Sequence, residues 1–294
     1  MAHVMVLAAG RGTRLGALTE ELPKPLVPVG DRPILRHICD ALVALGQGEV
    51  VINTHHLPEH FAEFDPGAIQ LRRVHEPLLR GTAGGVYGAR ALLKAPLVVY
   101  NADIWAAPPL GQLLAAAERA PISLLVQVTN GPGTVGLGED GRVVRLRGER
   151  FGEEAQAADY VGIAALGEVA LSALPEFGCL IGDLCLPWLR AGRPIATLPY
   201  AGKWDDLGTP EAYLALNLRW LAARSSTQDS SHVASGAELG ARVHLSECVV
   251  GAGAKIAAGV TLSRCVVWPG AVVHADTHEC ILTTRGRVVK AAQS

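Results

Sequence analysis

The sequence is poor in aromatic and charged residues and contains no long apolar run. Aromatic residues make up 5% and charged residues 18% of the 294 residues, whereas 33 residues are glycine and 18 are proline. No segment approaches the roughly 18 uninterrupted apolar residues of a membrane-spanning helix. The net charge of −2 gives no electrostatic reason to bind nucleic acid or an anionic membrane. We therefore expect a folded protein with small-molecule partners, and neither nucleic acid nor membrane among them.

The cysteines form no C-x-x-C pair. They are Cys39, Cys179, Cys185, Cys248, Cys265 and Cys280. This scatter is typical of reduced thiols in the cytosol and favours neither disulfides nor a metal site. The opening residues reach Gly10 and Arg11 after a short apolar stretch, which is unlike a signal or transit peptide. We expect a soluble, cytoplasmic protein.

Short apolar runs alternate with helical patterns up to about residue 224. The predicted strands are 4–7, 49–53, 69–74, 97–100 and 123–128, and the predicted helices are 33–45, 84–93, 111–119 and 210–224. This alternation predicts an α/β domain with a Rossmann-like, doubly wound, mainly parallel sheet. Ligands bind such sheets beyond the carboxyl ends of the strands, so the loops that follow strands are expected to carry the chemistry.

A polar segment, SSTQDSSH, divides the chain into expected domains 1–224 and 233–294, with 225–232 as a linker. After it, apolar residues recur every six positions, and LSECVVGAGA from Leu245 matches LSRCVVWPGA from Leu262 at a spacing of 17 residues. This pattern predicts a short left-handed β-helix of hexapeptide repeats. A solenoid this short has exposed ends, which favours a homo-oligomer formed through the β-helix.

The repeat also stacks Cys248, Cys265 and Cys280 on successive coils. A metal ladder is one interpretation of this stack. Because no histidine or carboxylate repeats beside the thiols, packing of small buried residues is the preferred interpretation.

The most informative stretch is LAAGRGTRL, which follows the first predicted strand and leads to PKPL. Gly10 and Gly12 allow a tight turn whose N–H groups face phosphate oxygens, and Arg14 and Lys24 add positive charge. The spacing fits neither the G-x-G-x-x-G dinucleotide pattern nor the G-x-x-x-x-G-K-[ST] phosphate loop. The stretch therefore predicts a phosphate-binding turn of another kind.

This stretch resembles the signature of the sugar-1-phosphate nucleotidyltransferases, G-x-G-T-R-L followed by P-K-P-L. The matching residues are Gly10, Gly12, Thr13, Arg14, Pro23, Lys24, Pro25 and Leu26. The resemblance implies that the glycine loop, from Ala8 and Ala9 through Thr13, binds an NTP. It also implies that Arg14 contacts the departing phosphates and that Lys24 binds near the α-phosphate, both as catalytic residues.

Two later stretches extend the resemblance to the nucleotide. EPLLRGTAGGV is similar to the family's E-x-x-P-L-G-T-A-G and implies nucleotide contacts at Glu76, Gly81 and Thr82. Glu76 stands where thymidylyl-transferring relatives carry glutamine, which argues against a dTTP pocket. VVYNADIW resembles the family's N-G-D and implies a nucleotide contact at Asn101 and a catalytic, Mg²⁺-binding carboxylate at Asp103.

The sugar side is represented by two further matches. KWDDLGTPEAYL resembles W-x-D-x-G-T-P-E and implies that Asp206 binds Mg²⁺ and lies beside the sugar. DYVGI matches Y-x-G-I and implies sugar contacts at Tyr160 and Gly162. Two carboxylates at loops on one sheet edge suit a hard divalent cation with phosphate co-ligands, so Mg²⁺ is the expected cofactor.

One feature of the family is missing. Many relatives carry an E-K-P segment whose lysine grips the sugar phosphate, whereas residues 128–159 contain only GRVVRLRGERFGEE in its place. Arg145, Arg147 or Arg150 are candidate substitutes, and the sequence does not choose among them. Together with VVINTHHL and the tryptophan of NADIW, this gap makes the chain look closest to N-acetylmuramate-1-phosphate uridylyltransferases and to mannose- or heptose-1-phosphate guanylyltransferases.

The resemblance implies transfer of a nucleotidyl group from an NTP to a sugar 1-phosphate, which gives a UDP- or GDP-sugar and pyrophosphate. A non-catalytic, nucleotide-sugar-binding regulatory subunit is the main alternative. The presence of Arg14, Lys24, Asp103 and Asp206 argues against it. An acyltransferase built on the hexapeptide repeats is a third interpretation, which only His244 and His274 keep open.

Overall fold

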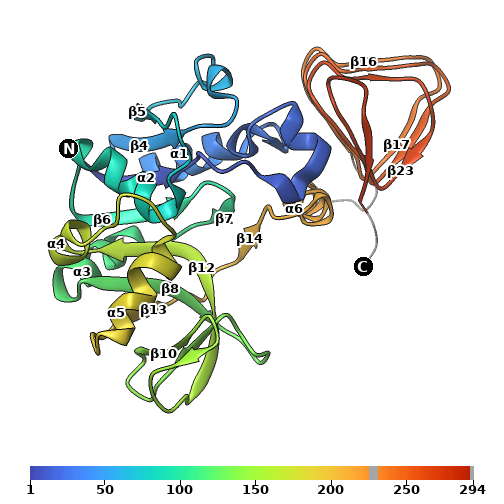
Figure 1. Cartoon of the computed structure of the whole chain (residues 1–294). Coiled ribbons are helices and arrows are strands. Elements are labelled where there is room, and N and C mark those ends of the chain that lie inside the picture. Colours follow the sequence, from blue (N-terminus) through green and yellow to red (C-terminus); the bar gives the residue numbers. More distant parts are fainter. Residues whose placement is uncertain (225–230, 292–294) are drawn as a thin grey trace. The chain divides into compact units, whose positions relative to one another are not determined.

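The structure is a computed structural model that describes residues 1–224 and 231–291. Contacts divide the chain into two compact units. The first contains Met1–Gly10, Ile38–Pro58 and Asp65–Trp204, and the second contains Arg11–His37, Glu59–Phe64 and the chain from Asp205 onward. The predicted α/β sheet and C-terminal β-helix are both present (Figure 1). Residues 225–230 of the predicted linker lie outside the described residues.

The first unit is built on a ten-stranded sheet in the order β11-β10-β9-β12-β6-β1-β4-β5, in which β8 pairs with β12 and β13. The strands are β1 (Ala2–Leu7), β4 (Glu49–Thr54), β5 (Gln70–His75), β6 (Leu93–Asn101), β8 (Ile122–Val128), β9 (Val135–Leu137), β10 (Val143–Leu146), β11 (Glu149–Arg150), β12 (Gln156–Leu166) and β13 (Ala196–Pro199). Strands β5, β4, β1 and β6 are parallel, and β12 runs antiparallel to β6. Residues 4–6 of β1 and 50–52 of β4 are apolar and buried, as expected of inner parallel strands that are covered on both faces.

Helices pack against the sheet, as the alternation predicts. They are α2 (Gly81–Ala89), α3 (Leu110–Arg119), α4 (Glu168–Ser172), a π-helical turn (Leu180–Cys185) and α5 (Leu186–Arg190), with a short 3₁₀ turn at Arg90–Leu92. Residues of α2, the π-helical turn and α5 form one buried cluster with Met5, Val51 and Val99 of the sheet. α3 contacts β6, β8 and β12.

The strands from β9 to β12, and α4 and α5, were not predicted from the sequence. β9 to β11 have two to four residues each, and α4 and α5 have five. Elements this short do not complete enough periods to give a hydrophobic pattern.

The register of the parallel strands brings their carboxyl ends together. Leu7 at the end of β1 pairs with Asn53 of β4 on one side and with Asn101 of β6 on the other. The segments that follow these strands therefore start from one edge of the sheet, where the sequence predicts the site.

The second unit begins with the segment after Gly10. It contains 3₁₀ helices η1 (Thr13–Glu20) and η2 (Lys24–Leu26), the hairpin of β2 (Pro28–Val29) and β3 (Arg32–Pro33), most of η3 (Pro58–Phe61) and the long helix α6 (Pro210–Arg224). Strand β7 (Ile104–Ala106) belongs to the first unit, whereas helix α1 (Ile34–Ala44) and strand β14 (Trp204–Asp206) have residues in both. None of the helices that the structure describes combines the length and hydropathy that a membrane crossing requires.

The β-helix consists of three sheets of short stacked strands, with the triangular outline visible in Figure 1. The strands are β15 (His232–Val233), β16 (Glu238–Leu239), β17 (His244–Ser246), β18 (Val249–Val250), β19 (Lys255–Ile256), β20 (Thr261–Ser263), β21 (Val266–Val267), β22 (Val272–Val273), β23 (Thr277–His278), β24 (Cys280–Leu282) and β25 (Val288–Lys290). Val249 pairs with Val266, which confirms the repeat of 17 residues, and Val266 pairs with Ile281 after a shorter coil. β25 closes the last coil as an antiparallel hairpin with β24.

The stacked cysteines are packed inside the coils. Cys248, Cys265 and Cys280 are buried, and each thiol donates to the carbonyl oxygen two residues earlier in its own coil. Outside the coil, Arg264 bridges Glu247 and Glu279 of the neighbouring coils. These contacts give the thiols the packing role preferred from the sequence.

Within the second unit, Tyr213 of α6 links Trp268 of the β-helix to Pro28 of strand β2. Its buried hydroxyl donates to the carbonyl oxygen of Pro28 at 2.5 Å and accepts a hydrogen bond from Nε1 of Trp268 at 3.0 Å. Burial raises the pKa of Tyr213 far above its usual range, so the hydroxyl stays protonated and can donate to the carbonyl oxygen of Pro28.

We expect Tyr213→Phe to lower the free energy of unfolding by roughly 1–3 kcal/mol, because it leaves a buried carbonyl and a buried indole N–H without their partner. Tyr87→Phe is the matched control, since the Tyr87 ring is only partly buried and packs against Arg90. Denaturant unfolding of both variants measures the effect. Equal stabilities would contradict a structural role for the Tyr213 hydroxyl.

Candidate active site

The turn that leaves β1 is fixed by a polar side chain from the next strand. The backbone N–H of Ala8 donates to Oδ1 of Asn53 at 2.8 Å, and the N–H of Ala102 donates to the carbonyl oxygen of Leu7 at 3.1 Å. Asn53 is buried at the end of β4. The start of the predicted phosphate-binding turn is therefore held from both neighbouring strands.

Glu76, a predicted nucleotide contact, is buried and engaged within the protein. Its Oε1 accepts a hydrogen bond from Nδ2 of Asn53 at 2.7 Å, and its Oε2 accepts one from the N–H of Arg80 at 3.0 Å. A Cβ atom at Gly85 would lie 2.5 Å from Nδ2 of Asn53, so α2 approaches this pair closely only because residue 85 is glycine. Glu76 thus orients Asn53, and through it Ala8, and a contact of Glu76 with the base stays a prediction.

Asn53 is a functional candidate that the sequence analysis missed. The available signal was a polar residue at the end of an otherwise apolar strand, VVIN. Such a side chain in a buried position needs hydrogen-bond partners, and here they are the Ala8 N–H and the Glu76 carboxylate.

In the second unit, the turn at Gly12 needs glycine for two reasons. Its φ of 63° lies in the left-handed region, and a Cβ atom there would be 2.8 Å from Cγ2 of Thr19 and 3.1 Å from Cβ of Lys24. The Gly12 carbonyl oxygen accepts hydrogen bonds from the N–H of Leu15 and the hydroxyl of Thr19. This turn brings the segment that carries Arg14 against the segment that carries Lys24.

Arg14, Lys24 and Asp206 form a charge cluster in the second unit. Nη2 of Arg14 lies 3.6 Å from Oδ2 of Asp206, and Nζ of Lys24 lies 3.8 Å from Oδ1 of the same carboxylate. The Lys24 side chain is only 10% exposed, whereas Arg14 is 65% exposed. Asp206 therefore compensates a largely buried ammonium group while leaving the guanidinium group open to solvent.

The neighbouring aspartate has a different partner. Asp205 forms an ion pair with Arg219 of α6. Gly208, two residues after Asp206, leaves room for Arg14, because a Cβ atom there would be 2.8 Å from Nη1 of Arg14. Of the two aspartates in KWDDLG, only Asp206 belongs to the charge cluster.

In the first unit, the end of β6 lies beside the middle of β12. Gly162 has a φ of 83°, and a Cβ atom there would be 3.2 Å from Nδ2 of Asn101 and 2.8 Å from Cγ1 of Ile104. Burial raises the pKa of Tyr160 far above its usual range, and the nearby Cys185, Cys179 and Asp103 act in the same direction. Gly162 therefore lies against Asn101 and Ile104, and the Tyr160 hydroxyl stays protonated at neutral pH.

Thr82 connects this region to the start of α2. Its hydroxyl accepts a hydrogen bond from the N–H of Leu180 at 2.6 Å, and the N–H of Ala83 donates to the carbonyl oxygen of Gly178. Gly81 has a φ of 77°, and a Cβ atom there would meet the backbone of Gly178. The segment 178–180 therefore lies directly against Gly81 and Thr82.

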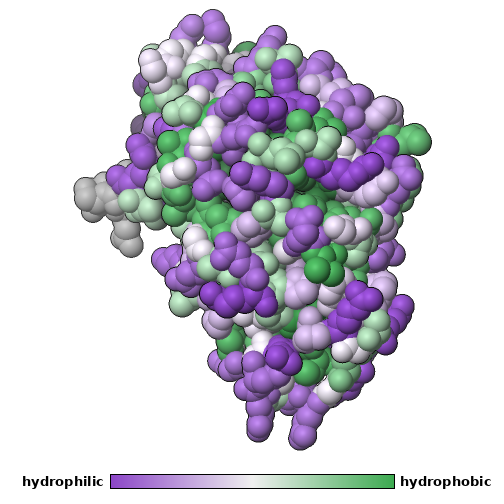
Figure 2. Space-filling view, turned by 90° about the vertical axis from the view of Figure 1, so that its left-hand side faces the viewer, coloured by the Kyte–Doolittle hydropathy of each residue, from purple (hydrophilic) through white to green (hydrophobic). Residues whose placement is uncertain are grey.

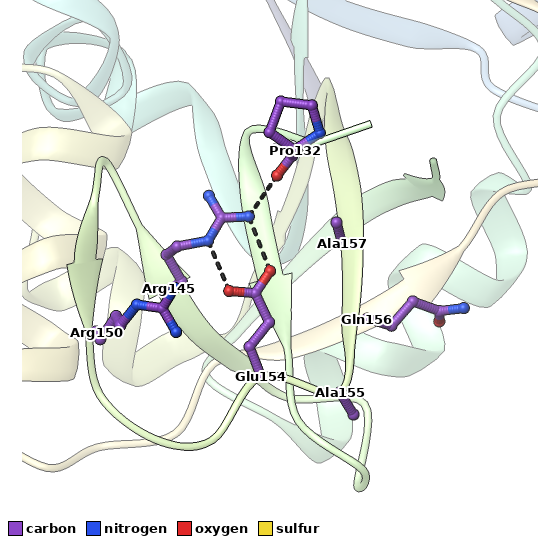
Figure 3. A pocket seen from close by; sticks show the side chains of 7 residues that line it. All are labelled: Pro132, Arg145, Arg150, Glu154, Ala155, Gln156 and Ala157. Atoms are coloured by element: carbon purple, nitrogen blue, oxygen red, sulfur yellow. Dashed lines mark hydrogen bonds and ion pairs between the residues drawn. The ribbon is translucent and has the colours of Figure 1, made fainter. Parts of the chain in front are cut away.

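The three candidate arginines have different surroundings. Arg145 pairs with Glu154 at 2.8 Å and donates to the carbonyl oxygens of Pro132 and Gly133. It lines an open pocket of about 580 Å³ together with Pro132, Arg150 and residues 154–157, and Figure 3 shows its guanidinium group directed at Glu154 and Pro132. The contact with Glu154 raises the pKa of the Arg145 guanidinium and lowers the pKa of the Glu154 carboxyl. Arg145 therefore serves the fold of this small pocket.

Arg147 points elsewhere. Its Nη2 lies 3.6 Å from Sγ of Cys179, and a Cβ atom at Gly182 would be 3.0 Å from its Nη1. Cys179 is next to Leu180, whose N–H donates to Thr82, and it is also near Tyr160. Arg147 is thus the one of the three arginines that contacts the segment packed against the predicted nucleotide and sugar residues.

Among the described residues, no group of three or more His, Cys, Asp or Glu side chains is arranged to hold a metal ion. The predicted metal ligands are two carboxylates, Asp103 in the first unit and Asp206 in the second. Two carboxylates need phosphate or water oxygens to complete a shell for a hard cation.

On the face drawn in Figure 2, hydrophilic and hydrophobic residues are interspersed.

Comparison with known proteins gives a consistent set of relatives. The family model described as nucleotidyl transferase matches residues 3–222. The chain is 29% identical over 223 residues to a mannose-1-phosphate guanylyltransferase of Mycobacterium tuberculosis, covering 71% of this chain and 62% of the relative. It is also 29% identical over 237 residues to a mannose-1-phosphate guanyltransferase of Pichia angusta, covering 74% of this chain and 64% of the relative. The chain thus spans less than two thirds of the length of these two proteins.

A solved structure supports the fold independently. The crystal structure of HddC from Yersinia pseudotuberculosis complexed with GMP-PN superposes with a TM-score of 0.63 at 18% sequence identity. The match covers 75% of this chain and 100% of that chain. At this identity the likeness concerns the fold of the matched region.

We expect Asn53→Asp to lower the free energy of unfolding by roughly 2–3 kcal/mol, because a carboxylate at position 53 faces the buried carboxylate of Glu76. Adding Glu76→Gln should restore most of the loss, since the glutamine amide then donates to the new carboxylate at position 53 and its oxygen still accepts from the Arg80 N–H. Thermal unfolding of the single and double variants measures this coupling. A double variant as unstable as the sum of the two single variants would contradict the hydrogen-bond chain from Ala8 through Asn53 to Glu76.

Proposed function

Because this chain belongs to the nucleotidyl transferase family, we propose that it is a sugar-1-phosphate nucleotidyltransferase that forms a GDP-sugar from GTP and a sugar 1-phosphate. The observation that carries the proposal is the cluster of Arg14, Lys24 and Asp206 at the expected signature positions. The names of the similar proteins from Mycobacterium tuberculosis and Pichia angusta support GTP and mannose 1-phosphate as the first substrates to test. UTP with other sugar 1-phosphates is the second choice.

In the proposed reaction, a phosphate oxygen of the sugar 1-phosphate attacks the α-phosphorus of the NTP. The bond from the α-phosphorus to the bridging oxygen breaks, and pyrophosphate leaves. The attacking oxygen is already anionic at neutral pH, so the reaction needs no general base. Arg14 and Lys24 bind the phosphates and offset the negative charge that moves to the leaving pyrophosphate.

Asp103 and Asp206 offer the carboxylate oxygens that Mg²⁺ prefers, and the proposal assigns the ion to them. When bound, Mg²⁺ supplies charge neutralisation and orientation of the phosphates. Arg14 and Lys24 both lie within 3.8 Å of the Asp206 carboxylate. The cluster therefore offers two cations and a carboxylate to an incoming phosphate chain and its metal ion.

We propose that Arg147 binds the phosphate group of the sugar 1-phosphate. Arg145 is paired with Glu154, and Arg150 lines the pocket around that pair. Arg147 instead contacts Cys179, beside the segment packed against Thr82, and Tyr160 lies near the same cysteine. The Tyr160 hydroxyl, protonated at neutral pH, can donate a hydrogen bond to a sugar oxygen.

A purely regulatory, nucleotide-sugar-binding role is less well supported, because a silent relative has no need to keep both cations and both carboxylates. A cytoplasmic location and assembly through the β-helix belong to the proposal as well. The domain boundaries at residues 224 and 233 are proposed to separate the catalytic region from the β-helix.

We expect Asp206→Asn to lower kcat at least about a hundredfold, since it removes the negative charge that binds the metal ion and pairs with Lys24. Asp103→Asn should have a similar effect. Asp205→Asn is the matched control, because the adjacent carboxylate pairs with Arg219 and should leave kcat within about twofold. Mg²⁺-dependent pyrophosphate release measures the rates, and circular dichroism checks folding. Full activity of folded Asp103→Asn and Asp206→Asn variants would rule out the proposed site.

We expect Arg147→Ala to raise KM for the sugar 1-phosphate about tenfold and to change KM for the NTP little, because a charge-assisted contact to phosphate contributes about 1.5–3 kcal/mol. Arg150→Ala is the matched control and should leave both KM values unchanged. Initial rates with either substrate varied separate the two constants. A rise in KM for the sugar 1-phosphate in Arg150→Ala instead of Arg147→Ala would show that Arg150 binds the sugar phosphate.

A further inference from the structure

The last hairpin of the β-helix ends in a compact turn. Between β24 and β25, the N–H of Thr283 donates to the carbonyl oxygen of Arg287 at 2.9 Å, and the N–H of Gly286 donates to that of Thr283 at 3.0 Å. The N–H of Arg287 donates to the Thr283 hydroxyl at 3.1 Å. These bonds order residues 283–287, which we call the terminal turn.

The terminal turn binds a buried carboxylate from the other end of the chain. Oε1 of Glu21 accepts a hydrogen bond from the Thr283 hydroxyl at 2.5 Å, and Oε2 accepts one from the N–H of Arg285 at 3.1 Å. Nε of Arg287 lies 3.6 Å from Oε1 of Glu21, and its Nη1 lies 2.6 Å from Oε2 of Glu20. Glu21 is 4% exposed and Thr283 is fully buried, so these contacts are sheltered from water.

Glu21 stands inside the signature segment, between its two cations. η1, which carries Arg14, ends at Glu20, and η2 begins at Lys24. The N–H groups of Glu21 and Leu22 donate to the carbonyl oxygen of Leu18, so the backbone at Glu21 closes η1. Fixing the Glu21 side chain therefore fixes the junction between the helix of Arg14 and the helix of Lys24.

A second set of contacts supports the same segment through α6. Tyr213 bonds to Pro28 and Trp268, and Oδ1 of Asn217 accepts a hydrogen bond from the N–H of Gly30 at 2.8 Å. α6 also contacts η1, β18 and β24. This part of the chain is thus attached to the β-helix directly at Glu21 and, through Tyr213 of α6, at Pro28.

We propose that Glu21 is a positioning residue through which the terminal turn of the β-helix holds Arg14 and Lys24 in place for the NTP. The effect on KM for the NTP rests on the proposed function, whereas the effect on the order of the segment 12–27 does not. Glu21 thereby gives the β-helix a part in catalysis without a second active site. A 1 Å displacement of binding groups lowers rates by up to about a hundredfold, so loss of this anchor should be measurable.

The test compares Thr283→Val with Thr284→Val in the full-length protein. Both changes remove a threonine hydroxyl from the same turn, but the Thr284 hydroxyl donates to Pro269 within the β-helix and does not contact Glu21. We expect Thr283→Val to speed hydrogen exchange of amides 12–27 about tenfold relative to Thr284→Val, because the segment opens more readily. We also expect KM for the NTP to rise about fivefold while KM for the sugar 1-phosphate stays unchanged.

Two further variants keep the test decisive. Thr283→Ser retains the hydroxyl and should restore both wild-type exchange and wild-type KM. Arg287→Ala removes the ion pairs with Glu20 and Glu21 but keeps the Thr283 hydroxyl, and it should speed exchange in amides 12–27 even if Thr283→Val does not fold.

The exchange measurement separates this inference from the proposed function. If no NTP and sugar 1-phosphate react even with the unaltered protein, the proposed function fails. The exchange rates still show whether the terminal turn orders the segment 12–27 through Glu21. Equal exchange in the segment 12–27 for Thr283→Val, Thr284→Val and Arg287→Ala would overturn the inference. Faster exchange with an unchanged KM for the NTP would overturn its catalytic part.

Discussion

The placement of Lys24 is the constraint on which the rest of the second unit depends. Its ammonium group is largely buried, and the Asp206 carboxylate compensates it at 3.8 Å. A buried charge without a partner costs several kcal/mol, so the segment after β1 and the segment before α6 must meet. Arg14 shares the same carboxylate but stays exposed. The outcome is one sheltered cation and one accessible cation around a single carboxylate, a pair suited to binding a chain of phosphates.

In each unit, a buried carboxylate fixes part of the signature segment 8–26 by hydrogen bonds. In the first unit, Glu76 and Asn53 hold the N–H of Ala8. In the second, Glu21 is held by the terminal turn of the β-helix. The first fixes the backbone at Ala8 and the second the backbone at the end of η1. Catalytic groups that act by charge and position need such support, because displacement weakens them more than loss of any one contact.

The fold was largely predictable, and the anchoring contacts were not. Strands 4–7 and 49–53 were found because they are apolar runs bounded by glycine or polar residues, and the 17-residue repeat predicted how Val249 stacks on Val266. The strands β9 to β12 were missed because they are short or interrupted by glycine. Glu21 and Asn53 were missed because their partners, Thr283 and Ala8, lie far away in sequence. Local patterns carry no information about such pairs, and the choice among Arg145, Arg147 and Arg150 likewise depends on partners such as Glu154 and Cys179.

The most direct test of the account is whether pyrophosphate and a nucleotide-sugar appear together. The purified protein should be incubated with GTP or UTP and with mannose, heptose, N-acetylmuramate or glucose 1-phosphate, with Mg²⁺ or with a chelator. Pyrophosphate is measured enzymatically and the nucleotide-sugar by mass spectrometry. We expect equal amounts of both products, only with Mg²⁺ and only when NTP and sugar 1-phosphate are both present. GTP with mannose 1-phosphate should give the highest rate. Binding of a nucleotide-sugar without any turnover of these pairs would contradict it.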